Sequence, residues 1–489
     1  MSILFNKITL KILGILSSIV GCAMILCAFV GMNFKEWLPS NIFMSTGLFF
    51  ACIGTIFIIF LRNKIIHLKP KDGYVISFST WVFCSIAGMI PYIAYGYPIS
   101  SSFFESVAAF STTGCSVFDL NMLPKSFLLW KALSNWLGGM GVLVLVTTMF
   151  SALGINAKSI VSSESTASIQ NSIGDRFSYT GKFLYIIYTV LTVIEYILLS
   201  LGPLGKFDAL INTLATVSTS GLLLTSNNIA PLSADYTRLI LLIFTLLTSI
   251  NYYLFYNLLK GQWKKIVNNM ELKVFLIIIV VSSILIGLDL RLQGGYESLT
   301  RSIWDAVCLV VSFISTAGYT VIDYLDWPMF SIMILFALTI IGGCSMSTSG
   351  SLKVIRIVTL FKLIQRRIFK QVHPHGVRPI KIDGKPISAE KVSATTAHIL
   401  LFFIVIIISC VVLGLEGLDL ETTVSTVIGL FTTTGLSLGT YGSLGFFGMF
   451  SPFAMFFLSI LMITGRLEMY TIIILLTKSF WQDNKASVI

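Results

Sequence analysis

The chain has 489 residues, of which 55% are hydrophobic and only 11% are charged, and its mean hydropathy is +0.89. Soluble globular proteins carry about 25% charged residues, so this composition excludes a soluble enzyme or binding module and indicates an integral membrane protein. The net charge of +11 is concentrated between residues 353 and 391, which hold ten Lys or Arg and two acids. Between membrane spans, such a segment indicates a cytoplasmic loop rather than a nucleic-acid site.

Apolar stretches long enough to cross a bilayer, about 20 residues each, predict ten membrane-spanning helices. In chain order they cover residues 9–31, 41–61, 75–97, 127–150, 180–203, 235–259, 271–290, 329–361, 394–415 and 450–479. Four shorter semi-apolar segments lie between the third and fourth, fifth and sixth, seventh and eighth, and ninth and tenth of these helices. They cover residues 101–112, 205–218, 302–315 and 419–432.

Each short segment ends in a motif of small residues that closes with glycine. The motifs are Ser111-Thr112-Thr113-Gly114, Ser218-Thr219-Ser220-Gly221, Ser315-Thr316-Ala317-Gly318 and Thr432-Thr433-Thr434-Gly435. Their glycines are 107, 97 and 117 residues apart, which indicates an internal repeat of about a hundred residues. A single copy would indicate helix packing, but four copies at the same place of a repeat favour a shared function.

We therefore predict an all-α integral membrane protein with ten transmembrane helices and four re-entrant pore helices. The expected architecture is a fourfold pseudo-symmetric pore of four helix–pore loop–helix repeats, which cover residues 73–178, 179–268, 269–392 and 393–489. Residues 1–72 form two additional N-terminal transmembrane helices. The basic connections all fall on one side if the helices alternate, which predicts that both termini are cytoplasmic.

The motifs have the properties of an ion filter. Non-helical backbone at membrane depth is tolerated only inside protein or along a water-filled path. A ring of backbone carbonyls can replace the hydration shell of a potassium ion, and glycine lets a carbonyl turn inward through backbone angles that other residues avoid. A short helix before each motif directs its negative end at the ring, which favours a cation. The predicted potassium-filter residues are Thr112, Thr113, Gly114, Thr219, Ser220, Gly221, Thr316, Ala317, Gly318, Thr433, Thr434 and Gly435.

A polar, glycine-bearing segment interrupts the eighth predicted helix at residues 342–351. Because it cannot be a regular lipid-facing helix, it should line the cavity beneath the filter; the alternative is a kinked but static helix. Arg466 lies within the last predicted helix, where a guanidinium is costly and is usually functional or paired. We interpret it as a charge beneath the filter that obstructs or tunes cation passage. The alternative is a structural pair with Glu468 or with loop carbonyls.

Other polar residues carry predictions of their own. Four acids are expected near the starts of the short helices, where they would cap the helix or concentrate cations at the pore mouth: Glu105, Asp208, Asp305 and Glu421. Glu195 lies within a span without an evident partner, and His398 is expected at a helix end rather than as a ligand. The dipeptide Asp383-Gly384 predicts a tight hairpin within residues 380–386.

Further stretches complete a recognisable pattern. They are Val117-Phe118 after the first motif, Trp136-Leu137-Gly138-Gly139-Met140-Gly141, Gly318-Tyr319-Thr320 with Asp323, Gly342-Gly343-Cys344 running to Lys353, His373-Pro374-His375 with Val377-Arg378-Pro379, and Gly465-Arg466-Leu467-Glu468. In this order, over nearly the whole length, they resemble the Trk/Ktr/HKT superfamily of potassium transporters, most closely its bacterial TrkH/TrkG branch.

The resemblance implies potassium permeation, because in that family a glycine in each motif goes with potassium. It also implies that the intramembrane loop gates the pore, with Gly342, Gly343, Ser347, Thr348, Gly350 and Arg466 as the gate residues. The implied partners are a second copy of the chain and a cytoplasmic TrkA-like nucleotide-binding regulatory subunit, in a bacterial inner membrane. The basic cytoplasmic face is compatible with anionic lipid. No nucleic acid, organic cofactor or catalytic residue is expected.

Two other classes compete with this interpretation. An intramembrane enzyme is disfavoured because the chain has no HExxH motif and no acidic pair flanked by glycines in two spans. A sodium- or proton-coupled secondary cation transporter should show inverted repeats and central carboxylates, whereas these repeats run in one direction and the spans are nearly free of acids. A fixed coupling ratio would favour a carrier, and large concentration-dependent currents would favour a channel-like pore.

Overall fold

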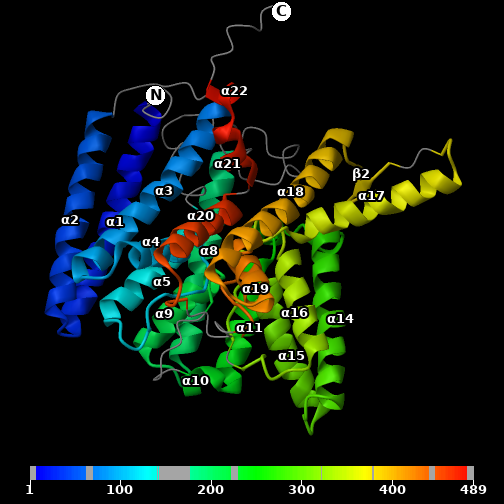
Figure 1. Ribbon diagram of the computed structural model, residues 1–489, viewed down its shortest axis with the longest axis horizontal. Helices are drawn as coiled ribbons and strands as arrows, with labels where there is room; N and C mark the ends of the chain where they lie inside the picture. The colour runs from blue at the N-terminus through cyan, green and yellow to red at the C-terminus, as the bar shows by residue number, and fades with distance from the viewer. Residues whose placement is uncertain are drawn as a thin grey trace, which may run out of the picture.

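A computed structural model describes residues 7–61, 70–139, 141, 177–221, 229–320, 322–376, 379–439, 447–467 and 469–481. In this part of the chain the structure is helical apart from loops and one small hairpin. Figure 1 shows most of the long helices standing side by side, and α17 running outward from the upper ends of α14 and α16. The first turn of α1 and the last helix, α22, lie at the same end of the molecule, the upper end of Figure 1.

Two N-terminal helices pack closely through small residues. They are α1 (Lys7–Asn33) and α2 (Trp37–Phe60). A Cβ atom built on Gly21 would lie 2.6 Å from the carbonyl oxygen of Gly47, and one built on Gly54 would lie 2.4 Å from that of Gly14. The two backbones therefore touch, which is how helices associate in a lipid environment.

In the described residues after α2, one unit occurs four times: a long helix, a short helix, the glycine motif and a second helix. The long helices are α3 (Pro70–Tyr95), α8 (Phe177–Ser200), α14 (Met270–Leu292) and α18 (Ala389–Leu413). The short helices are α4 (Ile99–Phe110), α9 (Lys206–Val217), α15 (Leu299–Ile314) and α19 (Leu420–Phe431). The second helices are α5 (Lys125–Gly139), α11 (Asp235–Ser249), α16 (Met329–Ile341) and α20 (Pro452–Arg466).

Smaller elements connect or extend these units. The helices are α10 (Ile229–Ser233), α12 (Tyr252–Leu259), α13 (Trp263–Val267), α17 (Val354–Val372), the 3-10 turn η1 (Gly414–Glu416), α21 (Met469–Leu476) and α22 (Lys478–Trp481). The strands β1 (Lys381–Ile382) and β2 (Lys385–Pro386) pair antiparallel across Asp383 and Gly384, whose φ angles are 49° and 77°. The predicted hairpin is confirmed.

Six helices of the described residues are long and apolar enough to cross a membrane, or up to eight if two bent pairs each count as one span. Several carry large apolar side chains on their outer faces, such as Ile277 on α14 (59% exposed) and Ile407 on α18 (63% exposed). Helices that are apolar both inside and outside the bundle belong in lipid. The chain is therefore a helical membrane protein, while the total of ten spans stays a prediction.

Three second helices are not the continuous spans that the hydropathy predicts. α11 and α12 meet at 91°, and α20 and α21 meet at 111°. α16 ends at Ile341, residues 342–353 are not helical, and α17 begins at Val354, so the predicted span over 329–361 is interrupted where the polar segment 342–351 indicated a break. The fourth predicted span, 127–150, is described only as far as Gly139 and at residue 141, and its remainder lies outside the described residues.

Candidate functional site

The four short helices end in the same backbone geometry. In the first, the N–H of Thr112 donates to the carbonyl of Ala109 (3.0 Å) and that of Thr113 to Ala108 (2.8 Å). The same pair of bonds, three and five residues back, closes the other helices at Thr219 and Ser220, Thr316 and Ala317, and Thr433 and Thr434. This arrangement is the Schellman helix end.

A threonine occupies the left-handed position of each helix end, where glycine is the usual residue. The φ angles are 58° at Thr112, 54° at Thr219, 58° at Thr316 and 60° at Thr433. A β-branched residue in this region is strained, and such strain persists only where the surrounding structure enforces it, often at functional sites. Because all four copies share this conformation, the left-handed threonine is a regular feature of the motif.

The motif glycines bring the four repeats into contact as a closed ring. A Cβ atom on Gly114 would lie 2.5 Å from the Ser220 carbonyl oxygen, and one on Gly221 would lie 3.0 Å from that of Ala317. A Cβ atom on Gly318 would lie 1.9 Å from the Thr434 carbonyl oxygen. One on Gly435 would lie 2.6 Å from the backbone nitrogen of Gly114, which closes the circle. The structure thus brings together all twelve predicted filter residues, and nearly all of them are buried.

Glycines also let the second helices approach the short ones. A Cβ atom on Gly138 of α5 would lie 1.9 Å from the carbonyl oxygen of Phe110, the last residue of α4. The same relation holds between Gly465 of α20 and Phe431, the last residue of α19, at 2.0 Å. These contacts explain why glycine stands at these two places.

Two of the acids predicted at helix starts lie elsewhere. Glu105 is the seventh residue of α4, fully buried, and pairs with Lys131 of α5. Asp305 lies in the second turn of α15 and pairs with Arg238 of α11 at 2.6 Å. Since the paired cation neutralises each carboxylate, neither can concentrate cations at a pore mouth. Instead, the pairs tie short helices to second helices.

The other two acids agree with the prediction. Asp208 and Glu421 lie in the first turns of α9 and α19. Asp419, which the sequence reasoning missed, caps α19 by accepting a hydrogen bond from the N–H of Thr422 (3.0 Å). Hydrogen bonding by Thr422 lowers the pKa of the Asp419 carboxyl. At the third short helix, burial and the nearby Asp305 carboxylate raise the pKa of the Tyr296 hydroxyl to about 12.

The intramembrane loop, defined here as residues 342–353, contacts the ring directly. The N–H of Gly350 donates to Thr316 Oγ1 (2.7 Å), and a Cβ atom on Gly350 would lie 2.4 Å from the Thr432 carbonyl oxygen. Positive φ angles at Gly342 (74°), Met346 (55°), Ser351 (64°) and Lys353 (78°) exclude the helical alternative for this segment.

The break between α11 and α12 explains how this loop is held. Helix ends leave carbonyl groups without intrahelical partners. The free carbonyls of Thr248 and Ser249 accept hydrogen bonds from the loop N–H groups of Thr348 (3.4 Å) and Cys344 (3.0 Å). The predicted continuous helix over 235–259 is wrong because the loop supplies these bonds instead.

Arg466 joins the loop to the end of α5. Its guanidinium donates to the carbonyl oxygens of Thr348 (2.8 Å), Gly138 (2.9 Å) and Gly139 (2.6 Å). The predicted alternative of bonds to loop carbonyls is therefore present, while Glu468 lies outside the described residues, as do Met140, Val377 and Arg378.

The remaining predicted gate residues also belong to this loop. Ser347 Oγ donates to the carbonyl of Cys344 (2.5 Å). A Cβ atom on Gly343 would lie 2.3 Å from Ser349 Oγ, and one on Gly342 would lie 2.7 Å from Ser351 Cβ. Gly342 and Gly343 are therefore required by close packing within the loop, whereas Gly350 is required by its contact with the fourth motif.

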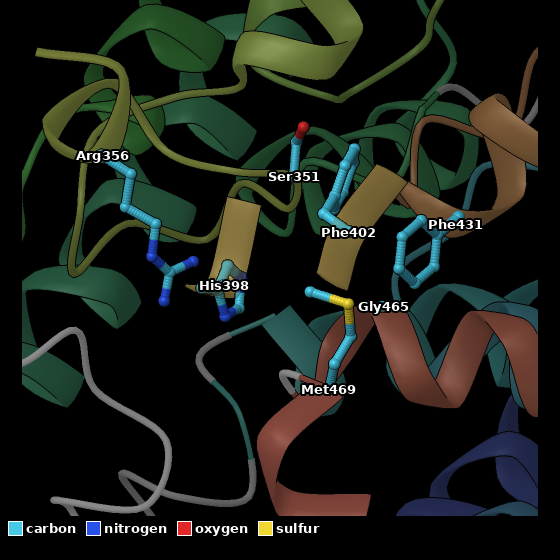
Figure 2. A pocket seen from close by; sticks show the side chains of 7 residues that line it. All are labelled: Ser351, Arg356, His398, Phe402, Phe431, Gly465 and Met469. Carbon is cyan, nitrogen blue, oxygen red and sulfur yellow. The ribbon is translucent and has the colours of Figure 1, made fainter. Parts of the chain in front are cut away.

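A small cavity borders the loop on the side of α18 (Figure 2). It is lined by Ser351, Arg356, His398, Phe402, Phe431, Gly465 and Met469. Figure 2 shows the Arg356 guanidinium and the His398 ring on one side, and Phe402 and Phe431 on the other. His398 lies in the middle of α18, not at a helix end as predicted, and its Nδ1 has no partner among the described residues.

Two further buried carboxylates, Glu195 and Glu271, differ in their hydrogen bonding. Both carboxylate oxygens of Glu195 on α8 are buried and have no hydrogen-bond partner in the described part of the chain. Glu271, in the first turn of α14, is 3% exposed and accepts two hydrogen bonds from Ser345 of the loop. Sequence reasoning missed Glu271; an acid at the start of an otherwise apolar span was the available signal.

These features define a class: a helical membrane protein whose centre is a ring of four equivalent backbone segments. Over the described ranges no group of three His, Cys, Asp or Glu side chains could hold a metal ion. Residues 39–487 match the family described as TrkH, cation transport protein, and the chain belongs to that family. The predicted family membership is confirmed.

Curated relatives are similar over almost the full length. The Trk system potassium uptake proteins TrkH of Salmonella typhimurium and of Escherichia coli K12 are each 29% identical over 485 residues, covering 98% of this chain and all of the relative. TrkG of Escherichia coli K12 is 27% identical, covering 90% of this chain and 92% of the relative. The crystal structure of the potassium transporter TrkH from Vibrio parahaemolyticus matches with a TM-score of 0.85 at 28% identity. This match covers 97% of this chain and 99% of the Vibrio parahaemolyticus chain. These relatives are transporters, not enzymes.

Proposed function

We propose that the protein takes up potassium across a bacterial inner membrane through a channel-like pore, one per chain. The observation that carries this proposal is the closed ring of four motifs with identical helix ends. In the proposed architecture, ten helices span the membrane, both termini are cytoplasmic, and the four short helices re-enter it.

The chemistry of the ring suits an alkali cation. Backbone carbonyls of four equivalent segments can replace the hydration shell of an ion on a common axis. Each of the four short helices ends at the ring, so their partial negative charges add there. The names of the relatives, potassium uptake proteins, support potassium as the substrate.

We propose that the intramembrane loop is the gate. Its contact with Thr316 and its bond to Arg466 place it against the motifs, so movement of the loop would change access to the ring. A cytoplasmic nucleotide-binding partner, pairing with a second copy of the chain and contact with anionic lipid through the basic loop complete the proposal.

A second candidate, a sodium- or proton-coupled carrier, is favoured by one observation. The buried Glu195 carboxyl lacks a partner among the described residues, and an intramembrane carboxyl group is a typical proton or cation site. A fixed ratio of potassium to sodium or protons in a flux measurement would support this candidate.

The filter proposal is tested with Gly114→Ser. The new Cβ atom would lie 2.5 Å from the Ser220 carbonyl oxygen, so the ring must shift to accept it, although the structure gives this glycine a φ angle that serine tolerates. We expect the ratio of potassium to sodium flux in proteoliposomes to fall about tenfold, which corresponds to about 1.4 kcal/mol. Gly414→Ser is the matched control, since nothing lies within 4 Å of a Cβ atom there. An unchanged ratio in folded Gly114→Ser would argue against the filter.

A further inference from the structure

We propose that Glu271 is the positioning residue that holds the intramembrane loop in place, and that the exposed hairpin turn at Asp383 governs this hold. The proposal rests on the gating role proposed above for the loop. It names the residues through which the cytoplasmic face would reach the gate.

Both carboxylate oxygens of Glu271 accept hydrogen bonds from the loop. Oε1 accepts a hydrogen bond from the backbone N–H of Ser345 (2.6 Å), and Oε2 accepts one from its hydroxyl (2.7 Å). The carboxylate is 3% exposed, and hydrogen bonds to a buried, charged acceptor are stronger than neutral ones. Among the loop contacts described above, only the bond from the Arg466 guanidinium to the Thr348 carbonyl also involves a charged group, so Glu271 is the charged attachment of the loop to α14.

Glu271 stands at a helix end that a second carboxylate also serves. Asp383 Oδ1, at the tip of the hairpin, accepts a hydrogen bond from the N–H of Met270, the residue before Glu271 (2.7 Å). Asp383 Oδ2 contacts the side chain of Asn269, which itself caps α14 through the N–H of Leu272 (2.8 Å). Unpaired N–H groups and the helix dipole favour anions at this end, so both carboxylates depend on the position of the first turn.

The hairpin also touches the helix that leaves the loop. Lys362 of α17 donates to the carbonyl of Lys381 in β1, and α17 begins directly after residue 353. Asp383, Gly384 and both strands are largely exposed, so a cytoplasmic partner can reach them. A displacement of the hairpin would therefore move the first turn of α14, where Glu271 binds Ser345. It would also move α17, which follows the loop directly.

The test measures basal potassium flux of the full chain in proteoliposomes, without any partner. Glu271→Gln should raise flux about tenfold, equivalent to about 1.4 kcal/mol, with the potassium-to-sodium ratio unchanged because the filter is intact. Ser345→Ala, which loses only the hydroxyl bond, should raise flux less. Glu390→Gln is the matched control: it removes an exposed acid in the first turn of another long helix, α18. Its flux should match the wild type.

The outcomes separate this proposal from the one on which it rests. If Glu271→Gln and Ser345→Ala conduct like the wild type while deletion of residues 343–350 raises flux, the hold by Glu271 is refuted and the gate stands. If the deletion also changes nothing in folded protein, the gate itself is refuted. A mere loss of stability would lower flux, so reduced flux in Glu271→Gln also overturns the proposal. Asp383→Asn should raise flux above that of Glu390→Gln; equal flux in these two refutes the role of the hairpin.

Discussion

The buried ion pair behind the first motif allows a quantitative prediction. Lys131 Nζ binds Glu105 and also donates to the carbonyl of Cys115 (2.8 Å), the residue that follows Gly114, and both charged side chains are at most 2% exposed. Glu105 also accepts hydrogen bonds from the N–H of Val117 (2.9 Å) and from Ser116 Oγ. The pair therefore holds α4, α5 and the chain beyond the motif together.

Removing one member leaves an uncompensated buried charge, which costs about 3–5 kcal/mol. Lys131→Met and Glu105→Gln should each destabilise the protein by this amount. The double variant should be more stable than either single variant, because no buried charge remains and the amide oxygen can still accept from Val117. The entropy of unfolding is about 2.1 cal/mol/K per residue, so for this chain about 1 kcal/mol corresponds to about 1 °C in Tm if it melts as one unit.

The assay is thermal unfolding of the full chain in detergent, followed by tryptophan fluorescence. Each single variant should lose about 3–5 °C and the double variant clearly less. Lys206→Met, at an exposed lysine that begins α9, is the matched control and should melt with the wild type. Single variants that melt with the wild type, or losses that simply add in the double variant, would refute the reasoning.

Two further predictions concern the ring itself. Gly318→Ala should abolish transport, since its Cβ would lie 1.9 Å from the Thr434 carbonyl oxygen, whereas Gly261→Ala, with a similar φ of 68° but open space, should cost about 1 kcal/mol and keep flux. Equal flux in these two variants would contradict the crowding argument. Thr316→Val removes the acceptor of the Gly350 N–H and should leak more potassium than Thr112→Val, whose hydroxyl has no partner among the described residues. Equal basal flux would show that this bond does not restrain the loop.

The short helices were predictable because their signals are local. The segment predicted over 419–432 is α19, Leu420–Phe431, and the one predicted over 205–218 is α9, Lys206–Val217. The hairpin at Asp383-Gly384 was predictable for the same reason, since two adjacent residues decide the turn. Continuous helices over 235–259 and 450–479 were wrong, because hydropathy does not register a bend inside an apolar stretch.

The partners of charged groups were not predictable from spacing. Glu105 pairs with Lys131, and Asp305 with Arg238, 67 residues earlier. Glu271 meets Ser345, 74 residues later in the chain. Such pairs depend on how helices pack, and one sequence without its fold does not contain that information in any local pattern.

By itself, the sequence determined the membrane class, the fourfold repeat, the places of the glycine motifs and the family pattern. Each of these depends on overall composition or on short motifs of neighbouring residues. Only the tertiary structure decided that the motifs close into a ring, that a threonine adopts the left-handed conformation in every repeat, and that Arg466 and Glu271 hold the loop. The ring and the attachment of the loop arise from contacts between segments that lie far apart in the chain, from 74 residues for Glu271 and Ser345 to 328 for Gly138 and Arg466, where backbone crowding and buried charge select one arrangement.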